Sequence, residues 1–225
     1  MATIAGELES IADLITMRLG YLEVLVAGWG AKLPWSCAEV VDAQESGEDP
    51  TRAWRAAVTA NQGALYGASA PPQVGAAFVM QWYLGVVANP VAWAAVLGPY
   101  VLDAAPEMLR FDLTADAWYP CAVSVSPERA VRVDDAGRRL ELAHAGYLDH
   151  ANRFVQGYRP GVKTGSRQRQ GMIRDAWVMA VESATEAFGT EPVEPSMRQS
   201  CCFIYALPGA TACARCPRNA KGASA

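Results

Sequence analysis

The sequence has few charges and few cysteines for its 225 residues, and each shortage excludes a class of protein. Charged residues make up 19% of the chain and hydrophobic residues 52%, which excludes intrinsic disorder, because disorder needs low hydrophobicity and high net charge. Six cysteines are too few for a small disulfide-stabilised scaffold. Nineteen glycines and 14 prolines are too few for a low-complexity chain. The net charge of −4 argues against nucleic acid as a partner, because nucleic acid needs a basic surface.

Charge is missing altogether between Ala56 and Leu102. Proline-containing pairs at 71–72, 89–90 and 98–99 are expected to divide this stretch into pieces. The longest piece, residues 73–89, is shorter than the roughly 20 apolar residues of a membrane-spanning helix. We therefore predict buried core helices, with membrane association that is at most peripheral, at the inner face of the membrane.

The opening residues, Met1 to Glu7, lack the basic patch and apolar run of a signal peptide. We therefore expect a reducing, cytoplasmic location, where cysteines are metal ligands more often than disulfide partners. A Gly-x-Gly-x-x-Gly sequence behind a strand is also missing, so we expect no bound nicotinamide. Residues 157–164 resemble a phosphate-binding loop but fail as one, because Val162 interrupts the Gly-Lys-Thr order.

Hydrophobic periodicity predicts an α+β fold with a mainly helical body and a small antiparallel sheet, followed by a short C-terminal cysteine module. Helical patterns cover residues 4–27, a short segment opened by the capping box at 36–39, 49–66, 147–158 and 168–188. Period-two alternation at 121–126, 130–133 and 139–142 predicts strands, with a turn at 134–137. We expect residues 1–190 to form the body, which would bind the substrate, and residues 197–225 to form the module.

Several reactive side chains of the body are expected to have structural roles. The two histidines, His144 and His150, lie six residues apart and share no helix face, so we expect surface or capping positions. The aromatic residues of the charge-free stretch are expected in the core, and two isolated cysteines are expected to be plain thiols. These residues are Trp82, Tyr83, Trp93 and Tyr100, with Cys37 and Cys121.

Four cysteines lie close together near the C-terminal end: Cys201, Cys202, Cys213 and Cys216. Four thiolates suit a tetrahedral zinc ion or an iron–sulfur cluster. A zinc ribbon has two separated Cys-x-x-Cys knuckles, whereas this segment has one knuckle and one adjacent pair. Adjacent cysteines in a regular strand would point to opposite faces, so the backbone at 201–202 must be irregular. The simplest assignment places the adjacent pair on one iron and the knuckle on the other.

This segment resembles the C-terminal module of the FhuF-like ferric siderophore reductases. The resemblance rests on the Cys-Cys-x10-Cys-x2-Cys pattern, together with Tyr205, Leu207-Pro208 and Pro217. It implies a [2Fe–2S] cluster held by Cys201, Cys202, Cys213 and Cys216. It also implies one-electron reduction of a ferric siderophore of the hydroxamate type, with release of Fe(II) in the cytoplasm. Electrons would come from a separate ferredoxin or flavoprotein, and no bound flavin is expected.

Basic residues supply the candidate contacts to an anionic siderophore or to a redox partner. Arg159, Lys163 and Arg167 lie in one basic segment of an otherwise acidic protein, and Arg198 and Arg215 flank the cysteines. Solvated surface positions are the alternative for all five residues.

Three other functions stay open at this point. The first alternative to the reductase is a [2Fe–2S] electron-transfer or redox-sensing protein. The second is a reductase of another small molecule in a biosynthetic pathway, and the third is a helical domain closed by structural zinc. The length of the body favours a reductase over a plain electron carrier, which needs no such core.

Overall fold

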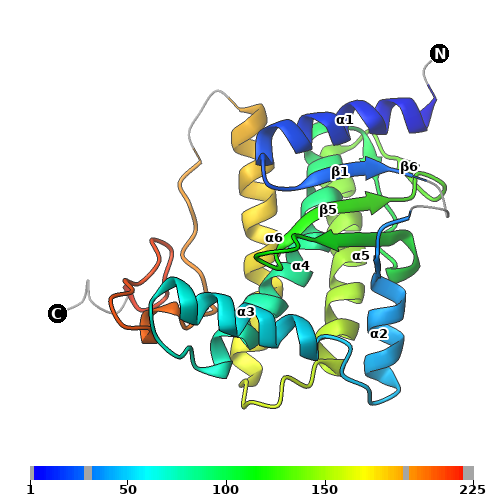
Figure 1. Cartoon of the computed structure of the whole chain (residues 1–225). Helices are drawn as coiled ribbons and strands as arrows, with labels where there is room; N and C mark the ends of the chain where they lie inside the picture. The colour runs from blue at the N-terminus through cyan, green and yellow to red at the C-terminus, as the bar shows by residue number, and fades with distance from the viewer. Residues whose placement is uncertain (1–2, 28–31, 190–192, 220–225) are drawn as a thin grey trace.

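A helical body packs against a small sheet, and the cysteine segment lies at one side of this body (Figure 1). The computed structural model describes residues 3–27, 32–189 and 193–219. The helices are α1 (Ile4–Leu19), α2 (Cys37–Glu45), α3 (Arg52–Leu65), α4 (Pro72–Leu97), α5 (Ala136–Gly157) and α6 (Ser166–Phe188), with short 3-10 turns η1 (Pro106–Met108) and η2 (Ile204–Ala206). The strands are β1 (Glu23–Val26), β2 (Trp35–Ser36), β3 (Tyr100–Val101), β4 (Leu109–Leu113), β5 (Pro120–Val125) and β6 (Val131–Arg132). The predicted α+β class is therefore confirmed.

The main sheet is mixed, with strand order β1-β5-β4-β2. Strand β1 runs parallel to β5, with Val24 opposite Val123, while β4 is antiparallel to both β5 and β2. Strands β3 and β6 form a separate antiparallel pair. The predicted strand at 121–126 is confirmed, but the hairpin predicted over 130–142 is wrong. Its second arm lies in α5, which begins at Ala136 because the Asp135 carboxylate accepts a hydrogen bond from the Arg138 N–H at 2.6 Å.

The predicted helix over residues 4–27 is also too long. Helix α1 ends at Leu19, because Gly20 takes a left-handed conformation and donates its N–H to the Thr16 carbonyl. The Thr16 hydroxyl then accepts from the Val24 N–H at 2.8 Å, which turns the chain into β1. The glycine-rich stop expected at 28–30 lies outside the described residues.

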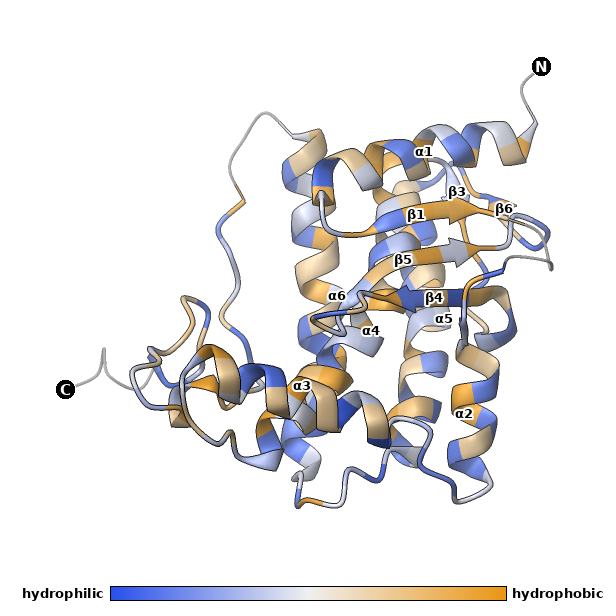
Figure 2. Cartoon of the chain, in the orientation of Figure 1, coloured by the Kyte–Doolittle hydropathy of each residue, from blue (hydrophilic) through white to orange (hydrophobic). Residues whose placement is uncertain are grey.

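Helix α4 forms the centre of the core and runs through Pro90, so the expected break at that residue is wrong. By length and composition α4 is the one described helix able to cross a membrane, but 72% of its most apolar window is buried within the fold. Burial of most of its surface explains why α4 needs no charged face. The surface helices α2 and α3 show the opposite pattern, with polar and apolar bands that alternate along them (Figure 2).

The other helix starts largely follow the sequence. The Ser36 hydroxyl caps α2 by accepting from the Glu39 N–H at 3.4 Å, as predicted. Helix α3 begins at Arg52, slightly after the predicted Asp49-Pro50 start, because the Asp49 carboxylate is engaged by the Arg55 guanidinium at 2.5 Å. Helix α6 matches its predicted range, and α5 starts earlier than predicted.

The buried aromatic residues surround one buried histidine. Tyr83, Trp93 and Tyr100 are almost fully buried, as predicted. His150 is also buried, which contradicts the expected surface position. Its Nδ1 lies 2.7 Å from the Ala104 carbonyl and its Nε2 lies 2.9 Å from the Tyr83 hydroxyl. Both ring nitrogens are therefore satisfied by a neutral imidazole, and burial lowers the pKa of His150 to about 4.

Candidate metal centre

The cysteine segment has little regular structure and depends on the body for its shape. Its described part contains one short turn, η2, and otherwise follows an irregular path beside α6 (Figure 1). Phe203 has a positive φ of 63°, a rare conformation for a residue with a side chain. Cys201 and Cys202 themselves lie in no helix or strand, so the irregular backbone predicted at the adjacent pair is confirmed.

The four cysteines fall into a buried pair and a half-exposed pair. Cys202 and Cys216 are 6% and 2% exposed, while Cys201 and Cys213 are half-exposed. A tight turn, in which the Cys216 N–H donates to the Cys213 carbonyl at 2.9 Å, closes the Cys-x-x-Cys knuckle. The Phe203 N–H donates to the sulfur of Cys201 at 3.4 Å.

The four thiols influence one another across the segment. The pKa of Cys201 responds to the thiols of Cys202 and Cys216, and the pKa of Cys213 responds to the same two thiols. Burial, and then the neighbouring thiols, raise the pKa of Cys201 and of Cys213. Because each half-exposed thiol responds to both buried ones, the adjacent pair and the knuckle are neighbours in the fold. The assignment of cysteines to individual irons stays a prediction.

The number and spacing of the thiols decide which metal centre they suit. Within the described ranges, no three His, Cys, Asp or Glu side chains form a group that could hold a metal ion as they stand. A structural zinc ion needs four ligands around one centre, whereas a two-iron cluster needs only two thiolates for each iron. Four thiols suit either centre by number, and the Cys-Cys-x10-Cys-x2-Cys spacing, with a single knuckle, favours the [2Fe–2S] cluster.

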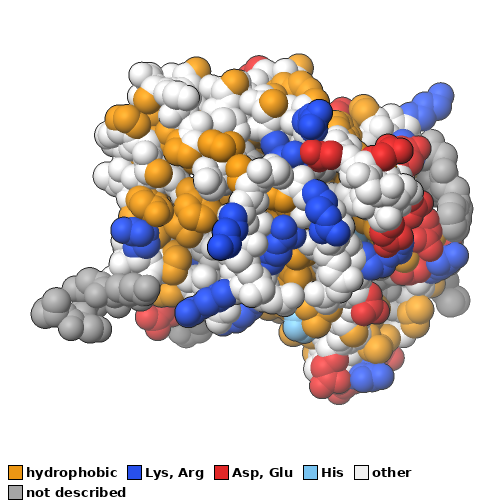
Figure 3. Space-filling view, turned by 90° about the horizontal axis from the view of Figure 1, so that it is seen from below, with side chains coloured by type: hydrophobic (Ala, Val, Ile, Leu, Met, Phe, Trp, Pro, Cys, Tyr) orange, Lys and Arg blue, Asp and Glu red, His pale blue; other side chains and the backbone are white. Residues whose placement is uncertain are grey.

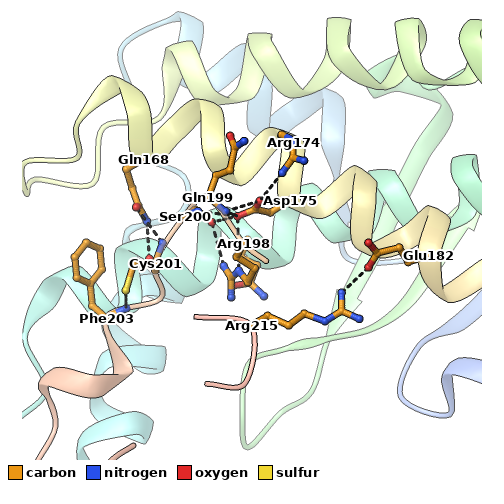
Figure 4. Close-up of polar contacts among 11 residues, drawn as sticks. Gln168, Arg174, Asp175, Glu182, Arg198, Gln199, Ser200, Cys201, Phe203 and Arg215 are labelled. Atoms are coloured by element: carbon orange, nitrogen blue, oxygen red, sulfur yellow. Dashed lines mark hydrogen bonds and ion pairs between the residues drawn. The ribbon is translucent and has the colours of Figure 1, made fainter. Parts of the chain in front are cut away.

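Asp175 of α6 anchors the chain just before the cysteines (Figure 4). Its side chain is 4% exposed and accepts hydrogen bonds from the Gln199 N–H at 2.9 Å, the Ser200 N–H at 2.8 Å and the Ser200 hydroxyl at 2.5 Å. The Arg198 guanidinium, also buried, lies 3.7 Å from the same carboxylate. A single buried carboxylate thus accepts hydrogen bonds from three donors of the module and forms a longer ion pair with one of its cations.

Two further contacts from α6 hold Cys201 in place. The Gln168 amide group donates to the Cys201 carbonyl at 2.5 Å and accepts from the Cys201 N–H at 3.0 Å. One turn further along, a Cβ atom on Gly171 would lie 3.1 Å from the carbonyl carbon of Gln199. The module therefore approaches α6 more closely than most side chains would permit.

The knuckle is tied to α6 by an ion pair at the other end of the module. The Arg215 guanidinium, on a residue between Cys213 and Cys216, lies 2.7 Å from the Glu182 carboxylate. Glu182 also accepts from the Ser196 N–H at 3.0 Å. Figure 4 shows Gln168 with Cys201 at one end of this row of contacts and Glu182 with Arg215 at the other.

A cleft of about 530 Å³ opens beside this ion pair. Residues of α4 and α6 form its two long walls, the end of α1 and the start of β5 complete it, and Arg215 is the contribution of the cysteine module. Gln81 of α4 also lines the cleft and accepts from the Arg198 guanidinium at 2.8 Å. The cleft and the cysteine segment are therefore neighbours.

The structure places the five basic candidates in three different environments. Arg198 is buried against Asp175 and Gln81, so it is not available as an exposed contact. Arg215 lines the cleft. Arg159, Lys163 and Arg167 are exposed in and just after the loop that joins α5 to α6, away from the cleft lining. Figure 3 shows Lys and Arg side chains spread over the face that carries this loop, while acidic side chains gather toward one side.

Sequence reasoning missed the residues of α6 that hold the module. Gln168, Gly171, Asp175 and Glu182 recur at spacings of three, four and seven, which places them on one side of the helix. An acid inside an otherwise apolar helical pattern was the available signal, because a buried carboxylate requires partners.

Comparison with known families agrees with the geometry of the module. Residues 198–218 match the family model described as FhuF 2Fe-2S C-terminal domain. The match includes all four cysteines and confirms the resemblance predicted for this segment, but it leaves the body uncovered. Among curated proteins, no relative matches the chain.

Proposed function

We propose that this protein is a one-electron reductase of ferric siderophores, of the hydroxamate type, that works through a [2Fe–2S] cluster held by Cys201, Cys202, Cys213 and Cys216. The observation that carries the proposal is the match of residues 198–218, which contain these four cysteines, to the FhuF 2Fe-2S C-terminal domain. When bound, the cluster supplies one electron to the substrate.

The chemistry needs electron delivery rather than proton transfer or nucleophilic attack. Hydroxamate oxygens are hard and anionic, so they hold Fe(III) far more tightly than Fe(II). One electron added to the ferric complex gives a ferrous complex, which releases its metal without any bond of the ligand being broken. The protein must therefore bring its electron source close to the complex and leave part of that source accessible.

The residues around the thiols meet these needs. Cys201 and Cys213 are half-exposed, which leaves one edge of the site open to a partner or substrate. Hydrogen bonds to cluster sulfurs and nearby positive charge both raise a cluster's potential. The Phe203 N–H and the Arg198 guanidinium are the described groups placed to act in this way.

A separate, acidic electron donor completes the proposed cycle. Gln168 holds Cys201, and the exposed Arg167 directly precedes it in the chain. Arg167, Arg159 and Lys163 are exposed and none of them lines the cleft, so they offer positive charge to a ferredoxin or flavoprotein in the cytoplasm. Charge complementarity of this kind mainly accelerates encounter, so donor-dependent reduction should slow as salt is raised.

Two related functions use the same cluster. An electron carrier or redox sensor would need no substrate cleft, and a reductase of another small molecule would need a cleft of different chemistry. The cleft beside Arg215 favours a reductase over a carrier.

The test begins with the absorption spectrum of anaerobically purified protein and a count of iron and acid-labile sulfide. We expect visible bands with two irons and two sulfides, which dithionite bleaches and a ferric trihydroxamate restores. Cys213→Ser should lose the cluster, because a hydroxyl is a poor replacement for a thiolate. Cys121→Ser, at a half-exposed cysteine on β5, should keep it. Colourless protein with one zinc, or a reduced cluster that the ferric complex leaves bleached, would refute the proposal.

A further inference from the structure

The cleft between α4 and α6 has the size and composition of a ligand site. Its volume of about 530 Å³ lies within the usual range of small-molecule sites, roughly 300–1,000 Å³. Aromatic residues Tyr21, Trp82 and Tyr119 line it together with polar, uncharged residues such as Asn89 and Ser183. Apolar walls with a few polar groups are typical of sites that bind small organic molecules.

The cleft is joined to the cysteine module by a short chain of contacts. Arg215 stands between two of the cysteines and lines the cleft, and Glu182 fixes its guanidinium at 2.7 Å. The Arg215 carbonyl accepts from the Arg198 N–H at 3.1 Å, and the Arg198 side chain donates to Gln81 on the opposite wall. A molecule in the cleft would therefore contact Arg215, a residue of the cysteine knuckle itself.

We propose that this cleft, rather than the basic loop, binds the iron chelate, with the aromatic walls holding its organic shell and Arg215 marking the side from which the electron arrives. This inference rests on the proposed function. In the single transfer step, the reduced cluster loses one electron and becomes oxidised, and Fe(III) of the bound chelate gains it and becomes Fe(II).

The charges of the cleft restrict the kind of chelate. Among the described lining residues, charge is limited to Glu186 and Arg215, which cancel, and Arg215 is already paired with Glu182. A ferric ion held by three singly charged hydroxamates is neutral overall, whereas one held by three catecholates carries three negative charges. The cleft therefore fits a neutral chelate and lacks the unpaired cations that a highly anionic one needs.

Gly85 provides the test, because it lines the cleft from α4. A Cβ atom there would meet only the Asn89 amide, at 3.7 Å, so a larger side chain has room to grow into the cleft. Gly85→Phe should fill the site and leave the cysteine module untouched. Gly165→Phe is the matched control, because Gly165 lies at the start of α6 beside the basic loop, where an added Cβ atom would meet no heavy atom within 4 Å.

Binding is measured by calorimetry on cluster-loaded, oxidised protein, with the redox-inert gallium(III) complex of a linear trihydroxamate as the probe. We expect Gly85→Phe to weaken binding by about ten-fold or more, and Gly165→Phe to change it by less than about two-fold. A gallium tris-catecholate should bind more weakly than the trihydroxamate complex. In a parallel assay, ferricyanide, a small oxidant, should reoxidise the reduced cluster of both variants as fast as that of the wild type.

The outcomes separate this inference from the proposed function. Ser183→Phe fills the cleft from the opposite wall. If the gallium trihydroxamate binds Gly85→Phe and Ser183→Phe as tightly as it binds the wild type, the cleft is not the binding site, and the proposed reductase function is unaffected. Chelate that fails to bind the wild-type protein and fails to reoxidise its cluster would overturn both. If Gly85→Phe loses its visible absorbance, and with it the cluster, the affinity of Ser183→Phe alone decides whether the chelate binds in the cleft.

Discussion

Removing the charge of Asp175 should loosen the cysteine module without unfolding the body. In Asp175→Asn, one oxygen remains to accept hydrogen bonds, but three donors of Gln199 and Ser200 compete for it. The Arg198 guanidinium, with its side chain 8% exposed, loses its carboxylate partner. The variant therefore leaves both a buried cation and at least one buried N–H or O–H donor unsatisfied.

The size of the effect follows from these losses. Breaking a buried ion pair by removing one partner costs about 3–5 kcal/mol, and the 3.7 Å separation here places the cost at the low end. About 3 kcal/mol corresponds to a roughly 100-fold increase in the fraction of molecules in which the module is detached from α6. The helices of the body do not depend on these contacts, so their melting should change little.

Hydrogen exchange of the cluster-loaded protein measures this equilibrium directly. Amides of residues 196–203 should exchange roughly 100-fold faster in Asp175→Asn, and an added iron chelator should remove the cluster faster by a similar factor. Asp149→Asn, at an exposed position on α5, is the matched control and should behave as the wild type. Wild-type exchange and cluster loss in Asp175→Asn would show that Asp175 does not anchor the module.

Three further predictions concern other contacts. Gln168→Met removes both hydrogen bonds to the Cys201 backbone, so a chelator should extract the cluster several-fold faster. The loss of visible absorbance measures this rate. Gly171→Val forces the module away from α6 and should cost about 1–3 kcal/mol in thermal unfolding, whereas Gly165→Val, in open space, should cost much less. Because His150 is neutral in the fold and its pKa falls from 6.5 to about 4, its contribution is complete above pH 6.5 and is lost as the pH falls toward 4. Urea unfolding should lose about 2 kcal/mol between pH 7.5 and pH 5 through this residue, and His150→Gln should flatten that dependence.

The sequence predicted best those features that depend on neighbouring residues. The capping box at Ser36 and the Cys-x-x-Cys turn involve residues at most a few positions apart, and both are found as predicted. The parallel pairing of β1 with β5 joins segments separated by nearly a hundred residues, and no local pattern encodes it. For the same reason Leu22 and Leu25, which extend the apolar stripe of α1, were assigned to a helix rather than to the turn and strand that follow Gly20.

Two errors have a common physical cause, because tertiary packing outweighed a local signal. Pro90 lacks the N–H of a helical residue, but its helix is surrounded by packed side chains and continues through it. Residues 139–142 alternate as a strand does, yet Arg139 is buried in a helix, where it donates to the Ala95 carbonyl at 2.7 Å and to the Val133 carbonyl at 2.8 Å. Neither partner can be identified from periodicity alone.

Helix α6 explains why the cysteine module and the cleft occur together. Gln168, Gly171, Asp175 and Glu182 follow one side of the helix and hold the module, while Ala176, Ala180 and Ser183, at spacings of four and three, follow the adjacent side and line the cleft. Both sets are fixed on one rigid element, so the distance between the thiols and a bound molecule is set by the helix itself. A carrier that only exchanges electrons with other proteins needs the first side alone. The second side, together with Trp82 on α4 and the nearby Tyr21 and Tyr119, is what a reductase of a small molecule requires.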